Sequence, residues 1–247
     1  IQALPGPAAF YRVLMRYAPN QVFPDIVHLR CSGEPLEPEL VAQMGAAFPN
    51  AQRTQAYGAT DAGWRIAVPL PMTDPRVTQG AVGAPLPFFE TRLQPLPDLP
   101  SGQGELYVRG PAVCLGYLSE SGSHEGLTSD GWFSTRDIAE LGTDGCLYIR
   151  GRVDVLFKSG GRWVNPVEVE RLLGRLPGVA AARCFPKPHP LLGKAPVAEV
   201  VVNAGHALTP EALRDACLGQ LEDHQLPREF HMVPEVSVGA SGKKLRS

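Results

Sequence analysis

Residues 55–63, QAYGATDAG, place four chemically useful groups just after a predicted strand. Tyr57 offers an aromatic ring, Gly58 allows close approach of the backbone, Thr60 carries a hydroxyl and Asp61 a carboxylate. In open α/β sheets, ligands bind outside the carboxyl ends of the strands. A ring there can stack on a base, a hydroxyl can bond a phosphate oxygen, and a carboxylate can hold Mg²⁺. Taken alone, the string is more often an ordinary Asp-Ala-Gly turn.

The sequence around this segment is typical of an α/β layer. Residues 7–17 and 37–48 carry apolar residues at helical spacing, and residues 25–33 and 53–59 resemble short strands that run into loops. Between the first strand and the second helix lie Gly33, Glu34 and Pro35. This turn can contact a nucleotide through its backbone, or it can be a simple strand-to-helix connection.

From residue 80 to residue 150 the pattern changes to short alternating segments separated by Gly, Pro and Asp. Such a pattern predicts a small antiparallel barrel or meander. Within it, residues 130–137 read DGWFSTRD, so Asp137 follows a tight turn. A carboxylate in that place can accept hydrogen bonds from both hydroxyls of a ribose, although a helix cap or a surface turn explains the residue equally well.

After Gly151 a third pattern begins, and it predicts a compact α+β unit of about a hundred residues. Asn165, Pro166 and Glu168 predict a capped helix start, and Thr209 and Pro210 predict a second one. Strands are expected over residues 180–185 and 196–202 and at 229–233. We therefore expect three parts: residues 1–79 and 80–151 of a large domain, and a small mobile domain over 152–247.

Composition excludes several classes of function. The 247 residues have a formal net charge of −2 and 44% hydrophobic residues, so neither a nucleic-acid footprint nor a basic membrane face is expected. No apolar run approaches the ~20 residues that a membrane helix needs. Five widely spaced cysteines without a C-x-x-C motif, together with the absence of a signal peptide, favour reduced thiols and a cytoplasmic location.

Eight short motifs follow one another in a fixed order. They are SGEP (32–35), YGATD (57–61), VGAPLP (82–87), GELYVRG (104–110) with GY at 116–117, DGWFSTRD (130–137), GRVDVLFKSGG (151–161), EVE (168–170) and SGKKLR (241–246). This series resembles the second half of the adenylate-forming superfamily, over residues 24–246. That superfamily contains acyl- and aryl-CoA synthetases, the adenylation domains of nonribosomal peptide synthetases, and luciferases.

The resemblance implies a ligase that activates a carboxylic acid with ATP and Mg²⁺. The acid would form an acyl-adenylate with release of pyrophosphate, and a thiol would then take the acyl group. The thiol would be coenzyme A or the phosphopantetheine of a carrier protein. The stretch VNPVEVE (164–170) favours the acyl-CoA branch.

The resemblance also assigns roles to individual residues. Nucleotide-binding residues would be Gly33, Glu34, Pro35, Tyr57 (on adenine), Gly58, and Asp137 with Arg152 (on ribose). Thr60 would meet phosphate and Asp61 would take the place of the Mg²⁺-binding glutamate. In the small domain, Asp154 would be the hinge, Lys158 and Gly161 would serve thioester formation, and Lys243 would serve adenylation, where a lysine on a mobile loop compensates charge on the α-phosphate.

Three departures from the family pattern bear on these expectations. Asp61 is one methylene shorter than the family's glutamate, and Arg136 replaces the glycine of T-G-D, which often marks a special backbone conformation. The Ser/Thr/Gly-rich phosphate loop is absent. We therefore expect the chain to be one portion of an enzyme, inactive by itself, whose N-terminal portion could be a separate chain.

Two other functions remain open. The chain could belong to an adenylation domain that loads a carrier protein, which a basic patch around Arg162 and Arg183 would support. It could also be a non-catalytic fragment that binds nucleotide or a partner half. The sequence does not identify the acid, since Gly63 and Trp64 alone do not define a pocket.

Overall fold

The computed structural model describes residues 2–118, 120, 124–125 and 127–236, and it divides into two compact units. Unit 1 comprises residues 1–95 and 101–150, and unit 2 comprises residues 96–100 and 151–247. Each unit mixes sheets and helices, which confirms the predicted α/β and α+β class. The three-part division into residues 1–79, 80–151 and 152–247 stays a prediction.

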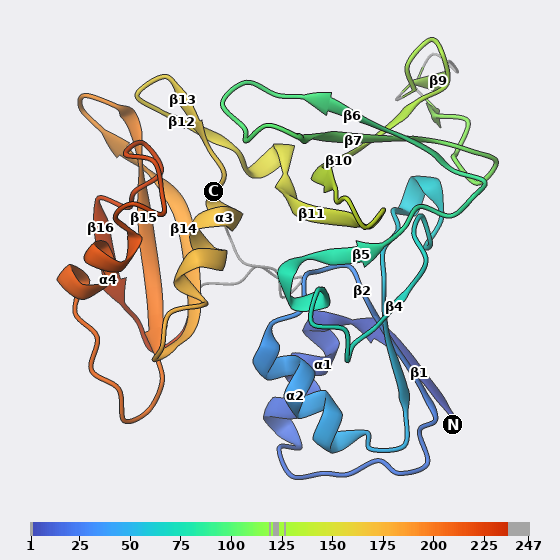
Figure 1. Cartoon of the computed structure of the whole chain (residues 1–247), viewed down its shortest axis with the longest axis horizontal. Helices are drawn as coiled ribbons and strands as arrows, with labels where there is room; N and C mark the ends of the chain where they lie inside the picture. The colour runs from blue at the N-terminus through green and yellow to red at the C-terminus, as the bar shows by residue number, and fades with distance from the viewer. Residues whose placement is uncertain (1, 119, 121–123, 126, 237–247) are drawn as a thin grey trace. The chain divides into compact units, whose positions relative to one another are not determined.

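The first sheet of unit 1 has the strand order β1–β2–β3–β4, with two helices beside it (Figure 1). Its elements are β1 (Ala3–Pro7), α1 (Ala8–Tyr17), β2 (His28–Ser32), α2 (Pro38–Ala47), β3 (Gln52–Ala56) and β4 (Leu70–Pro71). Strands β1, β2 and β3 run parallel, and β4 runs antiparallel to β3. Tyr11 from α1, Leu29 from β2 and Met44 from α2 share one buried core. Both helices and both strands predicted in this region are confirmed.

Strand β1 was not predicted, because its sequence ALPGP lacks the alternation of a strand. Proline cannot donate a backbone hydrogen bond, so it is confined to the edges of sheets. The structure places β1 at such an edge, paired with β2 from Ala3 opposite His28 to Pro7 opposite Ser32. Tyr11 donates a hydrogen bond of 2.6 Å to the Leu4 carbonyl and thereby fastens the strand to α1.

The second sheet of unit 1 has the order β5–β11–β10–β7–β6. Its strands are β5 (Ala81–Gly83), β6 (Glu90–Pro95), β7 (Gln103–Arg109), β10 (Phe133–Leu141) and β11 (Leu147–Arg152), and β8 (Tyr117–Leu118) pairs separately with β9 (His124–Glu125). The pairs β5–β11, β7–β10 and β6–β7 are antiparallel. The expected antiparallel barrel or meander corresponds to this five-stranded sheet, in which β5 and β6 are the outer strands.

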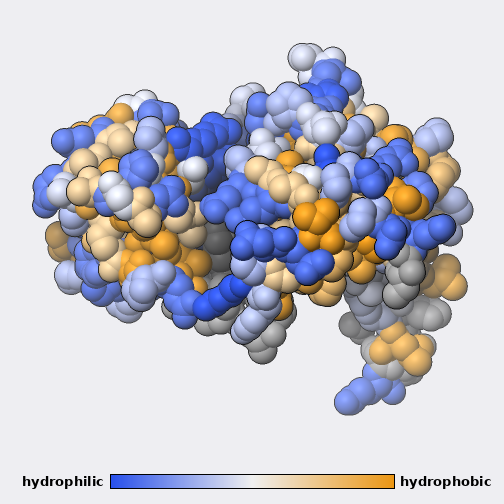
Figure 2. Space-filling model, turned by 90° about the horizontal axis from the view of Figure 1, so that it is seen from below, coloured by the Kyte–Doolittle hydropathy of each residue, from blue (hydrophilic) through white to orange (hydrophobic). Residues whose placement is uncertain are grey.

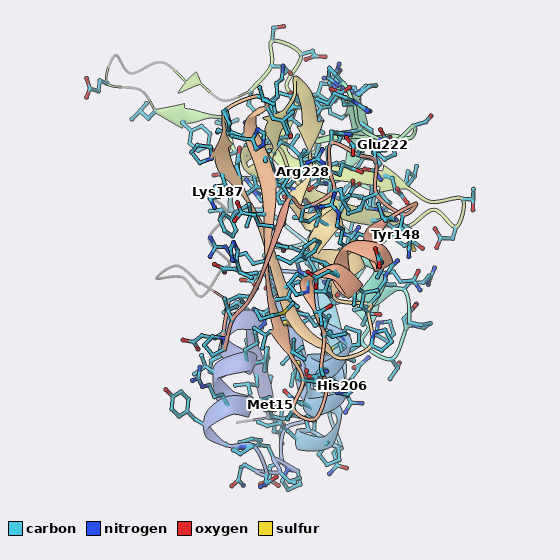
Figure 3. All side chains as sticks on the ribbon, turned by 90° about the vertical axis from the view of Figure 1, so that its left-hand side faces the viewer. Met15, Tyr148, Lys187, His206, Glu222 and Arg228 are labelled. Atoms are coloured by element: carbon cyan, nitrogen blue, oxygen red, sulfur yellow. The ribbon has the colours of Figure 1, made fainter. Side chains whose placement is uncertain are left out.

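A charged cluster anchors the turn between β10 and β11. Tyr148, labelled in Figure 3, donates a hydrogen bond of 2.9 Å to Asp144, and Arg76 lies 2.7 Å from the same carboxylate. A backbone hydrogen bond from Cys146, followed by the bonds from Arg76 and Tyr148, lowers the pKa of Asp144 to about 2. Arg76 directly precedes the 3₁₀ turn Val77–Gln79, so the cluster ties this turn to the second sheet.

Unit 2 contains a three-stranded sheet and two short helices. Its elements are the 3₁₀ turn Val153–Val155, β12 (Phe157–Ser159), β13 (Arg162–Val164), α3 (Pro166–Leu173), β14 (Val179–His189), β15 (Gly193–Val202), α4 (Pro210–Cys217) and β16 (Glu229–Met232). Strands β14 and β15 form a hairpin longer than the predicted strands, and β16 joins β15 in parallel. Val169, Leu173, Leu213 and Cys217 pack together, as the apolar stripes of the two helices predict.

Both helix starts in unit 2 have the predicted side-chain caps. The Asn165 side chain accepts a hydrogen bond of 3.1 Å from the Val167 amide, and Thr209 accepts one of 3.2 Å from the Ala212 amide. Asn165 is 1% exposed, whereas Thr209 is exposed. The Glu168 side chain accepts a hydrogen bond of 3.2 Å from Gln225.

Hydrophobic residues reach the surface in several places. In unit 1 the exposed ones include Val13 and Tyr17 of α1 and Trp64. Figure 2 shows hydrophobic patches among hydrophilic residues on the face that it presents. Among the described residues, no helix combines the length and the apolar character needed to cross a bilayer.

Replacement of the two cap residues should reveal their different burial. We expect Asn165→Ala to lower the free energy of unfolding of unit 2 by about 2 kcal/mol, since it also leaves buried polar groups without a partner. Thr209→Ala, at an exposed cap, should cost about 0.5–1 kcal/mol. Urea unfolding of both variants checks this, and an equal or larger loss for Thr209→Ala would contradict it.

Candidate functional site

Two loops leave the first sheet at the same edge. Strands β2 and β3 are parallel neighbours, and their last residues, Ser32 and Ala56, lie opposite each other. The predicted turn that begins at Gly33 follows β2, and the predicted segment that begins at Tyr57 follows β3. The sequence motifs SGEP and YGATD are therefore neighbours at the carboxyl ends of two parallel strands, the usual place for ligands in α/β sheets.

The turn after β2 depends on a left-handed glycine. Gly33 has φ +88°, a conformation that side chains disfavour, although nothing would crowd a Cβ atom there. Glu34 follows, and its carboxylate lies 2.6 Å from Arg12 of α1. The Glu34 carbonyl accepts a bond of 3.5 Å from the Gln55 side chain, which links this turn to β3. Pro35 is exposed.

The loop after β3 folds back tightly on itself. The Ile66 amide donates 2.8 Å to the Tyr57 carbonyl, and the Ala59 amide donates 3.1 Å to the Gly63 carbonyl. A Cβ atom on Gly58 would lie 2.3 Å from the carbonyl carbon of Trp64, so any other residue would push the two sides of the loop apart. The absence of a side chain at Gly58 therefore lets the two sides of this loop pack against each other.

Thr60 and Asp61 form a 3₁₀ turn, Thr60–Ala62, at the tip of this loop. Thr60 is exposed and Asp61 is half-buried. Tyr117 hydrogen-bonds the Asp61 carboxylate, and this bond raises the pKa of Tyr117. Tyr117 lies in the GY motif at 116–117, but the motif alone does not predict this contact with Asp61. The roles of Thr60 toward phosphate and of Asp61 toward Mg²⁺ stay predictions.

Tyr57 and Asp137, 80 positions apart in the sequence, meet directly. The Tyr57 hydroxyl donates a hydrogen bond of 2.6 Å to Asp137 Oδ2, and both residues are buried. The Asp137 amide bonds the Thr135 hydroxyl, which donates to the Leu106 carbonyl. The residue predicted to bind adenine therefore contacts the residue predicted to bind ribose. This contact cannot be predicted from either sequence motif alone.

Arg136 has a left-handed backbone, with φ +61°. It lies where the pairing of β10 with β7 shifts between Ser134 and Ile138, which marks a bulge. The glycine that Arg136 replaces would have adopted this conformation readily, and the chain keeps it with a side chain present. Arg136 Nη1 lies 3.5 Å from the buried Glu105.

The remaining predicted residues belong to unit 2. Arg152 lies 2.8 Å from Asp154, beside the turn Val153–Val155. Lys158 on β12 places its ammonium 4.9 Å from the ring centroid of Trp163 on β13, and Gly161 has φ +85° in the turn between the two strands. Lys243 lies outside the described residues.

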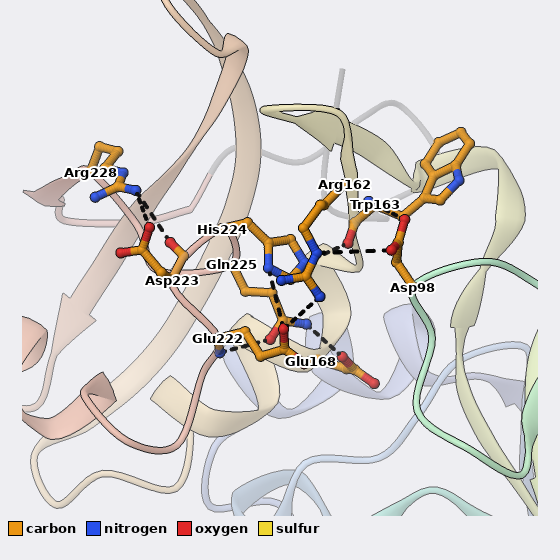
Figure 4. Close-up of polar contacts among 9 residues, drawn as sticks. All are labelled: Asp98, Arg162, Trp163, Glu168, Glu222, Asp223, His224, Gln225 and Arg228. Atoms are coloured by element: carbon orange, nitrogen blue, oxygen red, sulfur yellow. Dashed lines mark hydrogen bonds and ion pairs between the residues drawn. The ribbon is translucent and has the colours of Figure 1, made fainter.

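A second polar cluster of unit 2, shown in Figure 4, was not predicted. Arg162 lies 2.6 Å from Glu222 and 3.8 Å from Asp98, and His224 is 3.0 Å from the Trp163 carbonyl. Arg183, 8% exposed, pairs with Glu199 at 3.0 Å. Both arginines proposed for a carrier-binding patch are thus neutralised by carboxylates within their own unit.

A hollow of about 450 Å³ in unit 2 is lined by the exposed parts of residues such as Arg171, Arg175 and Glu222, and includes none of the predicted site residues. Among the described residues, no group of three or more His, Cys, Asp or Glu side chains has an arrangement that could hold a metal ion. A single carboxylate such as Asp61 is nevertheless sufficient where nucleotide phosphates supply the other ligands of Mg²⁺.

Two family models match most of this chain. The family described as AMP-binding enzyme matches residues 1–118, and the AMP-binding enzyme C-terminal domain matches residues 168–243. A 4-coumarate–CoA ligase-like protein of Oryza sativa subsp. japonica is 29% identical over 90% of this chain and 38% of its own length. The mitochondrial malonate–CoA ligase of Bos taurus is 31% identical over 88% of this chain and 41% of its own length.

A solved structure is similar over the whole chain. The o-succinylbenzoate CoA synthetase of Bacillus subtilis, in complex with the acyl-adenylate intermediate, has 26% identity and a TM-score of 0.73 over 100% of this chain and 50% of its own. Another structure of that synthetase is in complex with ATP and magnesium ion. The chain spans about two fifths of the curated relatives and half of this synthetase.

The left-handed backbone at Arg136 can be tested by comparing two substitutions. Arg136→Ala and Arg136→Gly remove the same side-chain contacts, so their difference isolates the backbone. Because a left-handed conformation costs a non-glycine residue about 1–2 kcal/mol, and glycine loses about 0.5–1 kcal/mol in chain entropy, Arg136→Gly should be the more stable variant by up to about 1.5 kcal/mol. Equilibrium unfolding measures this, and a more stable alanine variant would exclude the assigned conformation.

Proposed function

Because this chain belongs to the family of AMP-binding enzymes, we propose that it is the C-terminal portion of an acid–thiol ligase. The enzyme would join a carboxylic acid to the α-phosphate of ATP, release pyrophosphate, and pass the acyl group to a thiol. This chain would supply the nucleoside-binding edge of the large domain and the small domain that completes each half-reaction.

The convergence of three predicted segments at one edge of unit 1 carries the proposal. The turn after β2 adjoins the loop after β3, and that loop meets the bulge of β10 through the bond between Tyr57 and Asp137. A buried aromatic ring next to a carboxylate suits a nucleoside, since the ring face can contact a base and the carboxylate can accept from ribose hydroxyls. Gly33, Glu34 and Pro35 would line the same nucleotide through their backbone.

Thr60 and Asp61 would face the phosphates. The exposed Thr60 hydroxyl would bond a phosphate oxygen, and Asp61 would hold Mg²⁺ together with the phosphates. The ion would neutralise charge that builds on the phosphates as pyrophosphate leaves. Tyr117 would keep the shorter Asp61 side chain in one orientation through their hydrogen bond.

Unit 2 would act as the mobile domain. Asp154, in a short turn and paired with Arg152, would be the hinge, because a few residues at the end of an element absorb such motions. In one orientation Lys243 would reach the α-phosphate and the acid carboxylate. In the other, Lys158 and Gly161 on the β12–β13 hairpin would approach the adenylate for thioester formation. Arg152 would hold the ribose together with Asp137.

We propose coenzyme A as the thiol and a cytoplasmic location. The relatives described above are CoA ligases, and the carboxylate partners of Arg162 and Arg183 make a basic docking patch for an acidic carrier protein less well supported. Five free cysteines suit a reducing compartment. The relatives are named for different acids, so the acid has to be inferred from the residues of this chain.

Pyrophosphate release tests the proposed reaction. The full-length protein that contains this chain should release pyrophosphate from ATP and Mg²⁺ only when a suitable acid is present, and should form a CoA thioester. Acid-independent release, or nucleotide binding without any release across an acid panel, would favour a non-catalytic nucleotide- or partner-binding protein instead.

The role of Lys243 separates the two half-reactions. One charged contact made only in the transition state typically contributes about 2.7–4 kcal/mol, or roughly 10²–10³ in rate. Lys243→Ala should slow adenylate formation by that factor and should slow thioester formation from a synthetic acyl-adenylate far less. Lys244→Ala is the matched control, because it removes the neighbouring charge. Equal slowing of both steps by Lys243→Ala, or a larger defect in Lys244→Ala, would overturn the assignment.

A further inference from the structure

Two arginines and an exposed tryptophan form a cluster near the predicted site. The Arg30 guanidinium carbon lies 4.8 Å from the centroid of the Trp64 ring, and that of Arg65 lies 5.0 Å from it. Trp64 is 67% exposed, so this cluster lies at the surface of unit 1. We refer to these three residues as the arginine–tryptophan cluster.

The cluster joins the middle of β2 to the residues that follow the predicted phosphate and magnesium residues Thr60 and Asp61. Leu29 and Cys31 of β2 are buried in the core with α1 and α2, so Arg30 between them projects from the opposite face of the sheet. Trp64 and Arg65 follow the tight loop that carries Thr60 and Asp61. The backbone of Trp64 is held in place by two features of this loop. Ala59 and Gly63 form a β-bridge, and Gly58 packs closely against the Trp64 backbone.

The two guanidinium groups lack a counter-charge within the described part of the chain. Neither Arg30 nor Arg65 has an ion pair or a side-chain hydrogen bond there, and the Nε atom of each is buried without a hydrogen-bond partner. Burial and then the charge of Arg65 lower the pKa of Arg30, as expected for two cations held close together. Four other arginines of unit 1 have carboxylate partners within 3.0 Å: Arg12, Arg76, Arg109 and Arg150.

Contact with the tryptophan ring does not replace the missing carboxylate partners of the two arginines. A cation over an aromatic face gains only a modest interaction at an exposed site, and the ring provides no hydrogen-bond acceptor for the guanidinium N–H groups. An anion with two or three oxygens would supply both a counter-charge and hydrogen-bond acceptors, because the planar guanidinium pairs with carboxylates in a bidentate manner. It would also relieve the repulsion between the two arginines.

We propose that the arginine–tryptophan cluster binds a second anionic group of the acid substrate, a carboxylate or a sulfonate, while the reacting carboxylate lies toward Thr60. This inference rests on the proposed function and specifies its substrate as a dianionic acid. Trp64 would cover the carbon chain between the two charged ends. A phosphate of ATP or of coenzyme A is the alternative anion. Variants of the cluster would then change the KM for ATP or coenzyme A and not the preference between acids.

Matched acid pairs provide the test in the full-length protein. Each pair has the same chain length and differs in one methyl or carboxylate end: propionate and malonate, butyrate and succinate, pentanoate and glutarate. Wild-type protein should have the higher kcat/KM with the dianionic member of at least one pair. Arg30→Gln and Arg65→Gln should each lower the ratio of dianion to monoanion kcat/KM by about 10- to 100-fold, the range for a lost hydrogen bond to a charged group.

Arg16→Gln is the control, since it removes the same charge from the exposed end of α1, and it should leave the ratio unchanged. A wild-type preference for monocarboxylates in every pair would overturn the inference. So would variants that raise the KM for ATP or coenzyme A and leave the acid ratio unaltered.

Binding without turnover separates this inference from the proposed reaction. Titration with malonate, succinate and glutarate should change the tryptophan fluorescence of the wild type, and Arg30→Gln or Trp64→Phe should abolish the change. If no acid releases pyrophosphate but these titrations behave as expected, the proposed reaction fails and the anion site stands. If acids are activated but no dianion changes the fluorescence, the reaction stands and the anion site fails.

Discussion

The hydrogen bond between Tyr57 and Asp137 connects the two sheets of unit 1 at the place where the predicted site lies. The loop after β3 contributes the donor and the bulge of β10 contributes the acceptor, at 2.6 Å and out of solvent. A bond to a charged acceptor typically contributes about 1.5–3 kcal/mol, and leaving the carboxylate buried without it would cost at least as much. The bond therefore fixes the distance between the residues proposed for the base and for the ribose.

Several backbone constraints hold the two partners in place. Gly58 lets the loop after β3 close on itself, and Gly33 turns the chain away from β2 in a left-handed conformation. Arg136 adopts the same kind of conformation without being a glycine, which costs stability and aims Asp137 into the interior. Thr135 offsets part of that cost by bonding both the Asp137 amide and the Leu106 carbonyl. Strain at this position is consistent with a backbone shaped for a ligand.

Local signals in the sequence predicted most of the elements, and long-range contacts accounted for what was missed. Asn165 and Thr209 begin helices because their side chains accept amide hydrogen bonds, a relation contained within three residues. The strand at Ala3–Pro7 escaped prediction because only an edge position tolerates its prolines. Motif order placed Tyr57 and Asp137 in one site, but their direct contact depends on pairing 80 residues apart. The pairing of Arg162 with Glu222, like the cluster around Trp64, has no local pattern to predict it.

The central claim is that the edge built around Tyr57 and Asp137 holds the nucleoside of an adenylate, with Asp137 on the ribose hydroxyls. Calorimetric titration of the full-length protein with AMP and with 2′,3′-dideoxy-AMP tests it most directly, in the wild type and in Asp137→Asn. An asparagine oxygen can still accept from Tyr57, so the fold should persist. We expect the wild type to prefer AMP by about 10- to 100-fold and Asp137→Asn to lose most of this preference. An equal preference for AMP in both proteins would contradict it.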